Sequence, residues 1–159
     1  YAIVSFKLKY YGEMITYVGM TAPMAVMSAI SWLKHPYDGD SGEVAVARLT
    51  RQQIVKLTVY GILVTFLMYF VLKYFNTANL PVSTVSIATS FAAAYLTFCR
   101  SNYYAIGYAL NDLVLIILWS AATLKDISYL PMISCFVMFL ANDIYGFCNW
   151  HRIKKRQGA

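Results

Sequence analysis

Charged residues are scarce in this sequence. Only 13 % of its 159 residues are Asp, Glu, Lys or Arg, whereas 60 % are apolar and the mean hydropathy is positive. An ordinary soluble domain carries about 25 % charged residues, so the composition excludes that class. The apolar residues fall in blocks of about twenty, long enough for a helix to cross the hydrocarbon core of a bilayer. The sequence therefore predicts a membrane protein.

Acidic residues are the scarcer kind, because seven Asp and Glu stand against thirteen Lys and Arg, which gives a net charge of +6. A nucleic-acid-binding domain gathers its basic residues on one face. Here they lie between and after the apolar blocks, the distribution that orients membrane helices. We expect no nucleic-acid partner. We predict a cytoplasmic C-terminus, since that orientation places nine basic residues inside and four outside.

Cysteine is also rare, and the chain carries no recognisable cofactor motif. Cys99, Cys135 and Cys148 are scattered without metal-ligand spacing, which predicts buried thiols instead of disulfides or a metal site. The acidic, glycine-rich turn at 36–42 lacks the ligand pattern of a calcium loop, and the sequence has no phosphate-binding glycine loop. We therefore expect no metal and no cofactor.

Five apolar blocks predict spanning helices at 10–33, 54–75, 79–98, 102–124 and 127–150. Pro23 predicts a kink in the first of them, and Glu13 is expected at the membrane interface near its start. The polar segment 34–52 is interpreted as a linker, with a short interfacial helix within 43–51. The chain opens on six residues that are too few to cross a bilayer and lacks an initiator Met. We interpret this opening as the tail of a helix whose beginning is missing.

Two of the predicted spans carry the same polar pair, Asn111-Asp112 in one and Asn142-Asp143 in the next. An ionised side chain deep in the hydrocarbon costs about 2.5–3.5 kcal/mol on insertion scales, so such residues normally face a bundle interior or a watery cavity. The two pairs are therefore expected to line a path or a pocket.

Helical spacing places aromatic residues beside these pairs. Tyr108, Asp112 and Trp119 are separated by four and seven residues, which puts them on one helical face. Asn142 and Tyr145, three residues apart, share a face of the next helix. The candidate substrate-binding residues are Tyr108, Asn111, Asp112, Trp119, Asn142 and Tyr145.

The chain also shows the outline of an internal repeat. Superposing Trp32 on Trp150 aligns two proline-containing helices that each follow a turn and end in Trp with basic residues beyond. These helices are four spans apart and therefore run parallel. Trp150 itself is interpreted as an interfacial belt residue. The repeat divides the all-α bundle into the end of a three-helix half (1–33), a cytoplasmic loop (34–53), a connecting span (54–76), a second three-helix half (77–150) and a basic tail (151–159).

The same residues carry a family resemblance. Segments 103–112 and 142–150, together with Leu118-Trp119, resemble the PnuC family of nicotinamide riboside transporters. The resemblance implies a SWEET-like three-plus-one-plus-three transmembrane bundle, N-terminally incomplete here, that forms a homotrimer in the lipid of the bacterial inner membrane. It also implies facilitated diffusion, with trapping of the vitamin by intracellular phosphorylation. Two residues of the family pattern, a glutamine and an aromatic, are replaced by Ala25 and Ala29.

The resemblance suggests a role for each candidate residue. Trp119 and neighbouring tyrosines would face the cationic pyridinium ring, an interaction that gains about 2 kcal/mol when desolvated. Asn111 and Asn142 would bind the carboxamide and the ribose hydroxyls. Asp112 and Asp143 would balance the ligand charge or fix the helices. Two alternatives stay open, a proton-coupled transporter of another small polar solute and an intramembrane aspartyl enzyme that uses this carboxyl pair.

Overall fold

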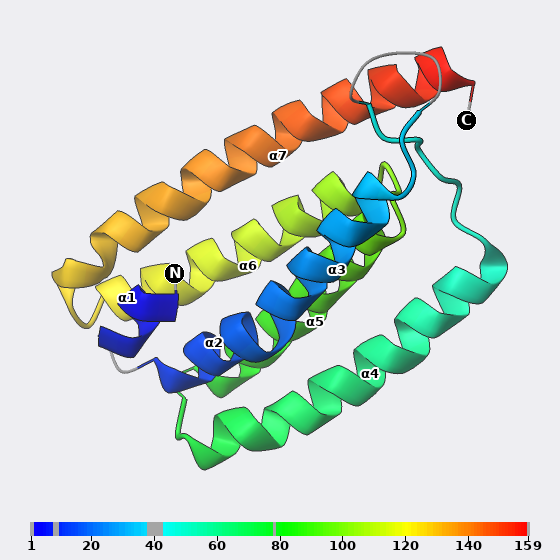
Figure 1. Cartoon of the computed structure of the whole chain (residues 1–159). Helices are drawn as coiled ribbons and strands as arrows, with labels where there is room; N and C mark the ends of the chain where they lie inside the picture. Colours follow the sequence, from blue (N-terminus) through cyan, green and yellow to red (C-terminus); the bar gives the residue numbers. More distant parts are fainter. Residues whose placement is uncertain (1, 8–9, 38–42, 78, 159) are drawn as a thin grey trace.

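The computed structural model describes residues 2–7, 10–37, 43–77 and 79–158, and these residues form a bundle of helices (Figure 1). They contain no β-strand beyond one isolated bridge between Pro36 and Val44. Five helical stretches are long and apolar enough to cross a membrane: Tyr11–Leu33, Arg51–Tyr74, Leu80–Phe98, Tyr104–Thr123 and Ile127–Gln157. The predicted all-α bundle with five apolar spans is confirmed.

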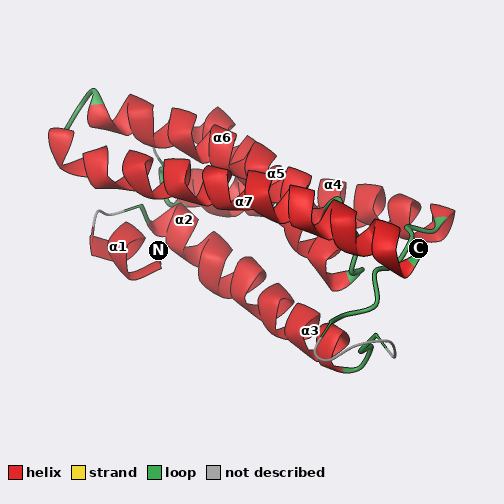
Figure 2. Cartoon of the chain, turned by 90° about the horizontal axis from the view of Figure 1, so that it is seen from above, coloured by secondary structure: helices red, strands yellow, loops and turns green. Residues whose placement is uncertain are grey.

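The helices form two sides of the bundle. The elements in chain order are α1 (Ala2–Lys7), α2 (Tyr11–Thr16), a π-helical turn (Tyr17–Thr21), α3 (Ala22–Leu33), α4 (Arg51–Tyr74), α5 (Leu80–Phe98), α6 (Tyr104–Thr123), a 3-10 turn (Ile127–Tyr129) and α7 (Leu130–Gln157). Figure 2 shows α1 to α3 on one side of the bundle, beside the layer that α4 to α7 form. Within that layer α5 and α6 are the inner helices.

The first span is irregular just before Pro23. α2, the π-helical turn and α3 follow one another without a gap, and the turn Tyr17–Thr21 occupies the place where a kink was predicted. A proline has no N–H to donate, and its ring clashes with the carbonyl four residues earlier. The wider π-helical turn accommodates that break in the hydrogen-bond ladder. It also changes which side chains of this span face the bundle interior.

Glu13, which was expected at the interface near the start of the first span, is buried and is not a solvated end residue. The side chain is 1 % exposed, and the Ser86 hydroxyl lies 3.5 Å from its carboxylate oxygen. The reason is the composition of α5, whose buried serines include one that the Glu13 side chain reaches. A carboxyl group can therefore be buried at this point with a hydrogen-bonding neighbour.

The linker also differs from its prediction, because residues 43–50 form no helix. Their backbone groups bond to other parts of the chain: Val46 N–H donates to Gln157 Oε1, and Ala47 N–H donates to the Arg100 carbonyl. An extended strap results, and α4 begins only where Thr50 and Gln53 form a capping box. Most of the predicted turn at 36–42 lies outside the described residues.

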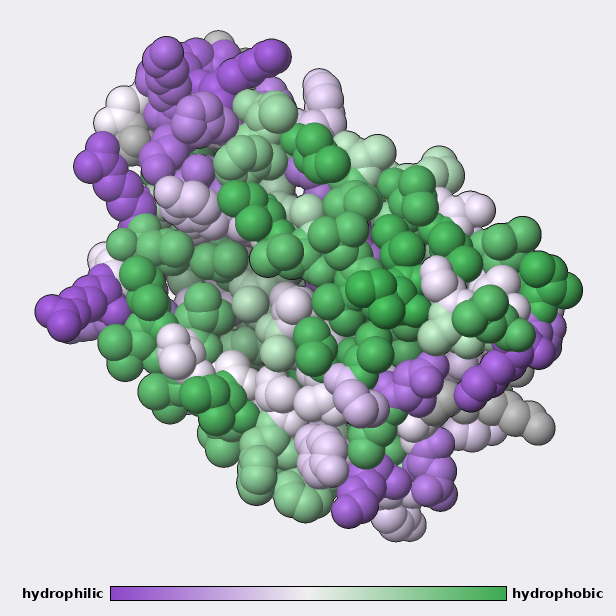
Figure 3. All heavy atoms as spheres, turned by 180° about the vertical axis from the view of Figure 1, so that it is seen from behind, coloured by the Kyte–Doolittle hydropathy of each residue, from purple (hydrophilic) through white to green (hydrophobic). Residues whose placement is uncertain are grey.

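Apolar side chains cover much of the outer surface. Figure 3 shows an apolar band across one face, with hydrophilic patches at its margins. On α4 this surface includes Val59, Ile62 and Phe66, and such residues are as well solvated by lipid tails as by a protein core. The same argument explains Cys135 and Cys148, which are exposed on α7 although buried thiols were predicted; Cys99 is buried. The chain is a multi-pass membrane protein.

α5 and α6 approach closely because small residues meet at their contact. Ser83, Ser86, Ser90 and Ala93 are all buried on α5. A Cβ atom added to Gly107 of α6 would lie 2.9 Å from Ala93 Cα and 3.1 Å from its Cβ. The small, hydroxylated composition of the third span thus serves close helix packing, as its sequence indicates.

We expect Gly107→Ala to lower the free energy of unfolding by about 1–3 kcal/mol, because the added methyl group meets backbone that cannot move aside. The apparent melting temperature of the purified protein measures this effect. Gly61→Ala is the matched control, since its new Cβ would lie 3.6 Å from the nearest atom, an ordinary contact with the Phe91 ring. If the melting temperature of the Gly107→Ala protein were no lower than that of the Gly61→Ala protein, the close contact would contribute nothing measurable to stability.

α3 and α7 run in the same direction (Figure 1), and aromatic side chains connect their C-terminal parts. There the Trp32 and Trp150 rings lie 5.2 Å apart, and Trp32 Nε1–H donates to the Thr97 carbonyl at 2.8 Å. The predicted basic tail continues α7 to Gln157, whose side-chain amide holds the strap at 43–47. Arg156 forms an ion pair with Glu43 of the same strap.

Candidate functional site

A cavity of about 510 Å³ lies between the first span and helices α5, α6 and α7. Its volume is within the range of small-molecule sites, which is roughly 300–1,000 Å³. The lining combines hydroxyl, amide, carboxyl and aromatic groups: Tyr17, Thr21, Ser90, Tyr104, Tyr108, Asn111, Asp112, Phe136, Phe139, Asn142, Asp143, Tyr145, Gly146, Asn149 and Trp150. Polar residues of two apolar helices thus meet at a hollow, as their cost in lipid predicts.

Five of the six candidate residues line this cavity. Tyr108, Asn111 and Asp112 come from α6. Asn142 and Tyr145 come from α7, and both are exposed residues that belong to the cavity lining. The two helices are antiparallel neighbours joined by a short turn, so their polar faces oppose each other at one level.

Trp119, the sixth candidate, is placed elsewhere. Its side chain is 0 % exposed, and its ring centre lies 4.8 Å from that of Tyr10 and 5.7 Å from that of Tyr129. Seven residues are two helical turns, or about 10.5 Å along the axis, so Trp119 shares the face of Asp112 but not its level. There it belongs to an apolar cluster with Leu115 and Phe136.

Asn111 is held in one orientation by its neighbours. Its Oδ1 accepts hydrogen bonds from the hydroxyls of Thr89 and Ser90, each at 2.8 Å. Because oxygen is the acceptor end of the amide, the NH2 group must point the other way. The Tyr17 phenol is hydrogen-bonded to the Asn111 side chain. The amide carries two N–H donors, of which the contact with Tyr17 uses one.

Asp112 and Asp143 face each other across the seam between α6 and α7. Their carboxyl groups lie within hydrogen-bonding reach of one another. Oδ2 of Asp112 is buried, and no N–H or O–H group of the described residues donates to it. Two carboxylates repel each other strongly where water is excluded. The pair is therefore complementary to a cation or to a shared proton.

The cavity also contains residues that the sequence did not single out as binding residues. Tyr17 and Thr21 reach it from the first span, four residues apart, and Tyr104 lies one turn before Tyr108 on α6. Trp150, interpreted from the sequence as an interfacial belt residue, also lines the cavity and packs against Tyr104, with ring centres 5.1 Å apart. The four-residue spacings from Tyr17 to Thr21 and from Tyr104 to Tyr108 could have identified both Tyr17 and Tyr104 from the sequence.

Ala25 and Ala29, where the sequence departs from the family pattern, do not appear on the cavity lining. Both are exposed on α3. The first span contributes to the cavity through Tyr17 and Thr21, about one to three turns nearer its start. Most of the polar lining therefore comes from α6 and α7.

Comparisons with known proteins agree with this picture. A sequence model of the family described as nicotinamide mononucleotide transporter matches residues 1–152. The nicotinamide riboside transporter PnuC of Neisseria mucosa is 28 % identical over 163 residues, an alignment that covers all of this chain and 62 % of that protein. A crystal structure of the vitamin B3 transporter PnuC matches with a TM-score of 0.79 and 26 % identity, covering 99 % of this chain and 68 % of that one. The chain thus spans less than two thirds of the length of the curated relative it matches.

Proposed function

The chain belongs to the nicotinamide mononucleotide transporter family, and on that premise we propose that it carries nicotinamide riboside through the cavity between α6, α7 and the first span. The observation that carries this proposal is the meeting of two amide-bearing helix faces at a hollow of suitable size. The similar proteins are described as carriers of nicotinamide riboside and of vitamin B3. Family membership argues against the intramembrane enzyme considered from the sequence.

The polar groups of the cavity match the neutral parts of this solute. The remaining N–H of Asn111 would donate to the carboxamide oxygen or to a ribose hydroxyl. Asn142 and Asn149 on the opposite wall offer both donors and acceptors to the other hydroxyls. A sugar that moves from water into the cavity needs new hydrogen-bond partners in place of water, since each unpaired buried hydroxyl costs about 1–3 kcal/mol.

The aromatic and acidic groups match the pyridinium ring. Tyr104, Tyr108 and Trp150 present ring surfaces to the cavity, and a desolvated cation over such a face gains about 2 kcal/mol. Asp112 and Asp143 would supply the balancing negative charge. Trp119 is buried away from the cavity, so the role first suggested for it passes to these rings.

We further propose the finer features that the family resemblance implies. These are facilitated diffusion, a homotrimer, a SWEET-like arrangement in which 77–150 is one three-helix half, and residence in the bacterial inner membrane with a cytoplasmic C-terminus. The exposed apolar side chains of α4 support a helix that faces lipid or a second copy. The clustering of basic residues near the C-terminus supports the orientation.

One observation favours a second candidate, proton-coupled transport of a small polar solute. The facing carboxyl groups of Asp112 and Asp143 are suited to hold one proton between them, as paired carboxylates elsewhere do. In liposomes, an imposed proton gradient would drive uptake above the equilibrium level for a coupled carrier and would leave it unchanged for facilitated diffusion.

The proposed substrate is tested by calorimetry on the purified protein with nicotinamide riboside, nicotinamide and nicotinic acid. We expect the riboside to bind at least about tenfold more tightly than nicotinamide, since each additional hydrogen-bonded group contributes roughly 1.4 kcal/mol. Nicotinic acid, an anion, should bind least because of the two aspartates. Equal affinity for all three compounds would refute a riboside site.

A further inference from the structure

A second hollow lies on another side of the α6–α7 seam. Its volume is about 310 Å³, and its lining contains two lysines, one histidine, two aromatic residues and one amide, with no acidic residue. The residues are Asn102, Tyr103, Phe147, His151, Lys154 and Lys155. None of them lines the transport cavity.

Helical geometry explains why the two hollows are separate. Successive residues of an α-helix point about 100° apart. Tyr104 turns toward the transport cavity, whereas Tyr103 is exposed on the outer side. On α7, Phe147 and His151 are one turn apart and follow Gly146 and Trp150, which line the cavity. The second hollow therefore opens toward the surroundings of the bundle and not into the solute path.

Lys154 is positioned at this hollow by its neighbours. Its Nζ lies 3.4 Å from Asn102 Oδ1 and 5.7 Å from the centre of the Tyr103 ring. Both contacts hold the ammonium group close to the start of α6 without neutralising its charge. Lys155 and His151 are exposed beside it. The one ion pair described in this region uses the adjacent Arg156.

An apolar stripe continues from the hollow along the outside of α6. Ile106 and Leu110 follow Tyr103 at three and seven residues, and Leu113 and Ile117 extend the same face. All four side chains are exposed. This order, a basic hollow and then a long apolar surface, matches a phosphate headgroup followed by acyl chains. A free phosphate ion would have no use for the stripe.

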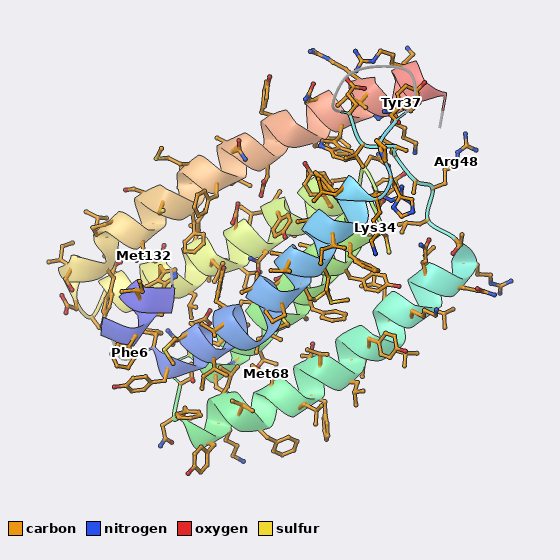
Figure 4. All side chains as sticks on the ribbon, in the orientation of Figure 1. Phe6, Lys34, Tyr37, Arg48, Met68 and Met132 are labelled. Atoms are coloured by element: carbon orange, nitrogen blue, oxygen red, sulfur yellow. The ribbon has the colours of Figure 1, made fainter. Side chains whose placement is uncertain are left out.

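The surrounding surface adds to the positive potential at this end of the molecule. Figure 4 shows Lys34 and Arg48 at the same end of the bundle as the C-terminal part of α7. Each basic residue near an anionic membrane surface contributes attraction that falls off within about 10 Å at ordinary salt. The hollow offers more than this diffuse attraction, because one of its lysines is held in place by neighbouring side chains and part of its lining is aromatic.

We propose that the hollow formed by Asn102, Tyr103, Phe147, His151, Lys154 and Lys155 binds the phosphate of an anionic phospholipid, whose acyl chains lie along the exposed face of α6. The site is independent of solute binding. It fastens α7 to the start of α6 at the level where the transport cavity ends.

The test uses native mass spectrometry of the purified protein titrated with phosphatidylglycerol, with phosphatidylcholine as the zwitterionic comparison, whose net charge is zero. We expect tight binding of phosphatidylglycerol and an affinity about fivefold lower for Lys155→Ala and about 25-fold lower for Lys154→Ala/Lys155→Ala, from roughly one lysine's attraction each. Arg51→Ala/Lys56→Ala is the matched control, because it removes the same charge from α4 at the same end of the bundle. Its affinity should stay close to that of the unchanged protein.

Three results would overturn the proposal. An equal loss of phosphatidylglycerol affinity in both double variants would show that the lipid is attracted by the overall charge and not by a specific site. Equal binding of phosphatidylcholine would show that the net negative charge of the lipid is not recognised at this site. Inorganic phosphate that displaced the lipid at equal concentration would assign the hollow to a free anion. Since Lys155 is exposed, its single substitution keeps the test valid if the double variant does not fold.

Discussion

Asn111→Leu is expected to weaken nicotinamide riboside binding about 100-fold, which corresponds to roughly 2.8 kcal/mol. The substitution removes the amide N–H that we propose donates to the ligand, from a residue that lines the cavity. It also leaves the Ser90 hydroxyl, which is buried, without the acceptor it now reaches at 2.8 Å. Each unsatisfied polar group at such a site costs about 1–3 kcal/mol. Calorimetric titration of the purified protein measures the change.

Asn142→Leu is the matched control, because the same substitution is made on the opposite wall. No hydrogen bond that fixes its side chain is described, so only the ligand contact is lost and we expect about a tenfold effect. A Thr89→Val/Ser90→Ala protein keeps the Asn111 amide but frees its orientation, and its affinity should fall between the two. If all three variants bound as tightly as the original chain, Asn111 would have no part in the site.

Trp119→Ala is expected to lower the free energy of unfolding by about 3–5 kcal/mol, the usual cost of removing a buried aromatic side chain. The ring is fully buried and contacts Tyr10 and Tyr129. We expect a lower melting temperature for the Trp119→Ala protein. Trp119→Phe should recover much of the stability because the aromatic packing is kept.

Trp150→Ala serves as the comparison, since that ring lines the cavity. It should reduce riboside affinity more than it reduces stability, whereas Trp119→Ala should do the reverse among molecules that remain folded. If Trp119→Ala instead weakened binding and left the melting temperature unchanged, Trp119 would have to reach the solute in another conformation of the protein.

The spans could be predicted from the sequence because their signal is local. Blocks of about twenty apolar residues define a membrane helix regardless of its neighbours. α4, α5 and α6 begin and end close to the expected residues, whereas α7 continues to Gln157, beyond the expected end at 150. The segment 43–50 could not be predicted in this way. Its extended form depends on bonds to Gln157 and Arg100, which are distant in sequence.

The sequence predicted which helix faces line the candidate site, but not how far along each helix the site extends. Periodicity identifies the face of a helix, and this was enough to bring Asn111 and Asn142 to one cavity. It does not give the level at which a neighbouring helix closes over that face, and Trp119 lies beyond that level. Glu13 shows the same limit, since its burial depends on the serines of α5.

The contact between Gly107 and Ala93 has a consequence for motion. Backbone meets backbone there, and the hydroxyls of Thr89 and Ser90 join the same two helices through Asn111. Such close packing resists sliding between the two helices, so we expect α5 and α6 to move together. If the chain carries a solute as proposed, opening to the two sides of the membrane would then involve movement of the first span or α7 relative to this helix pair.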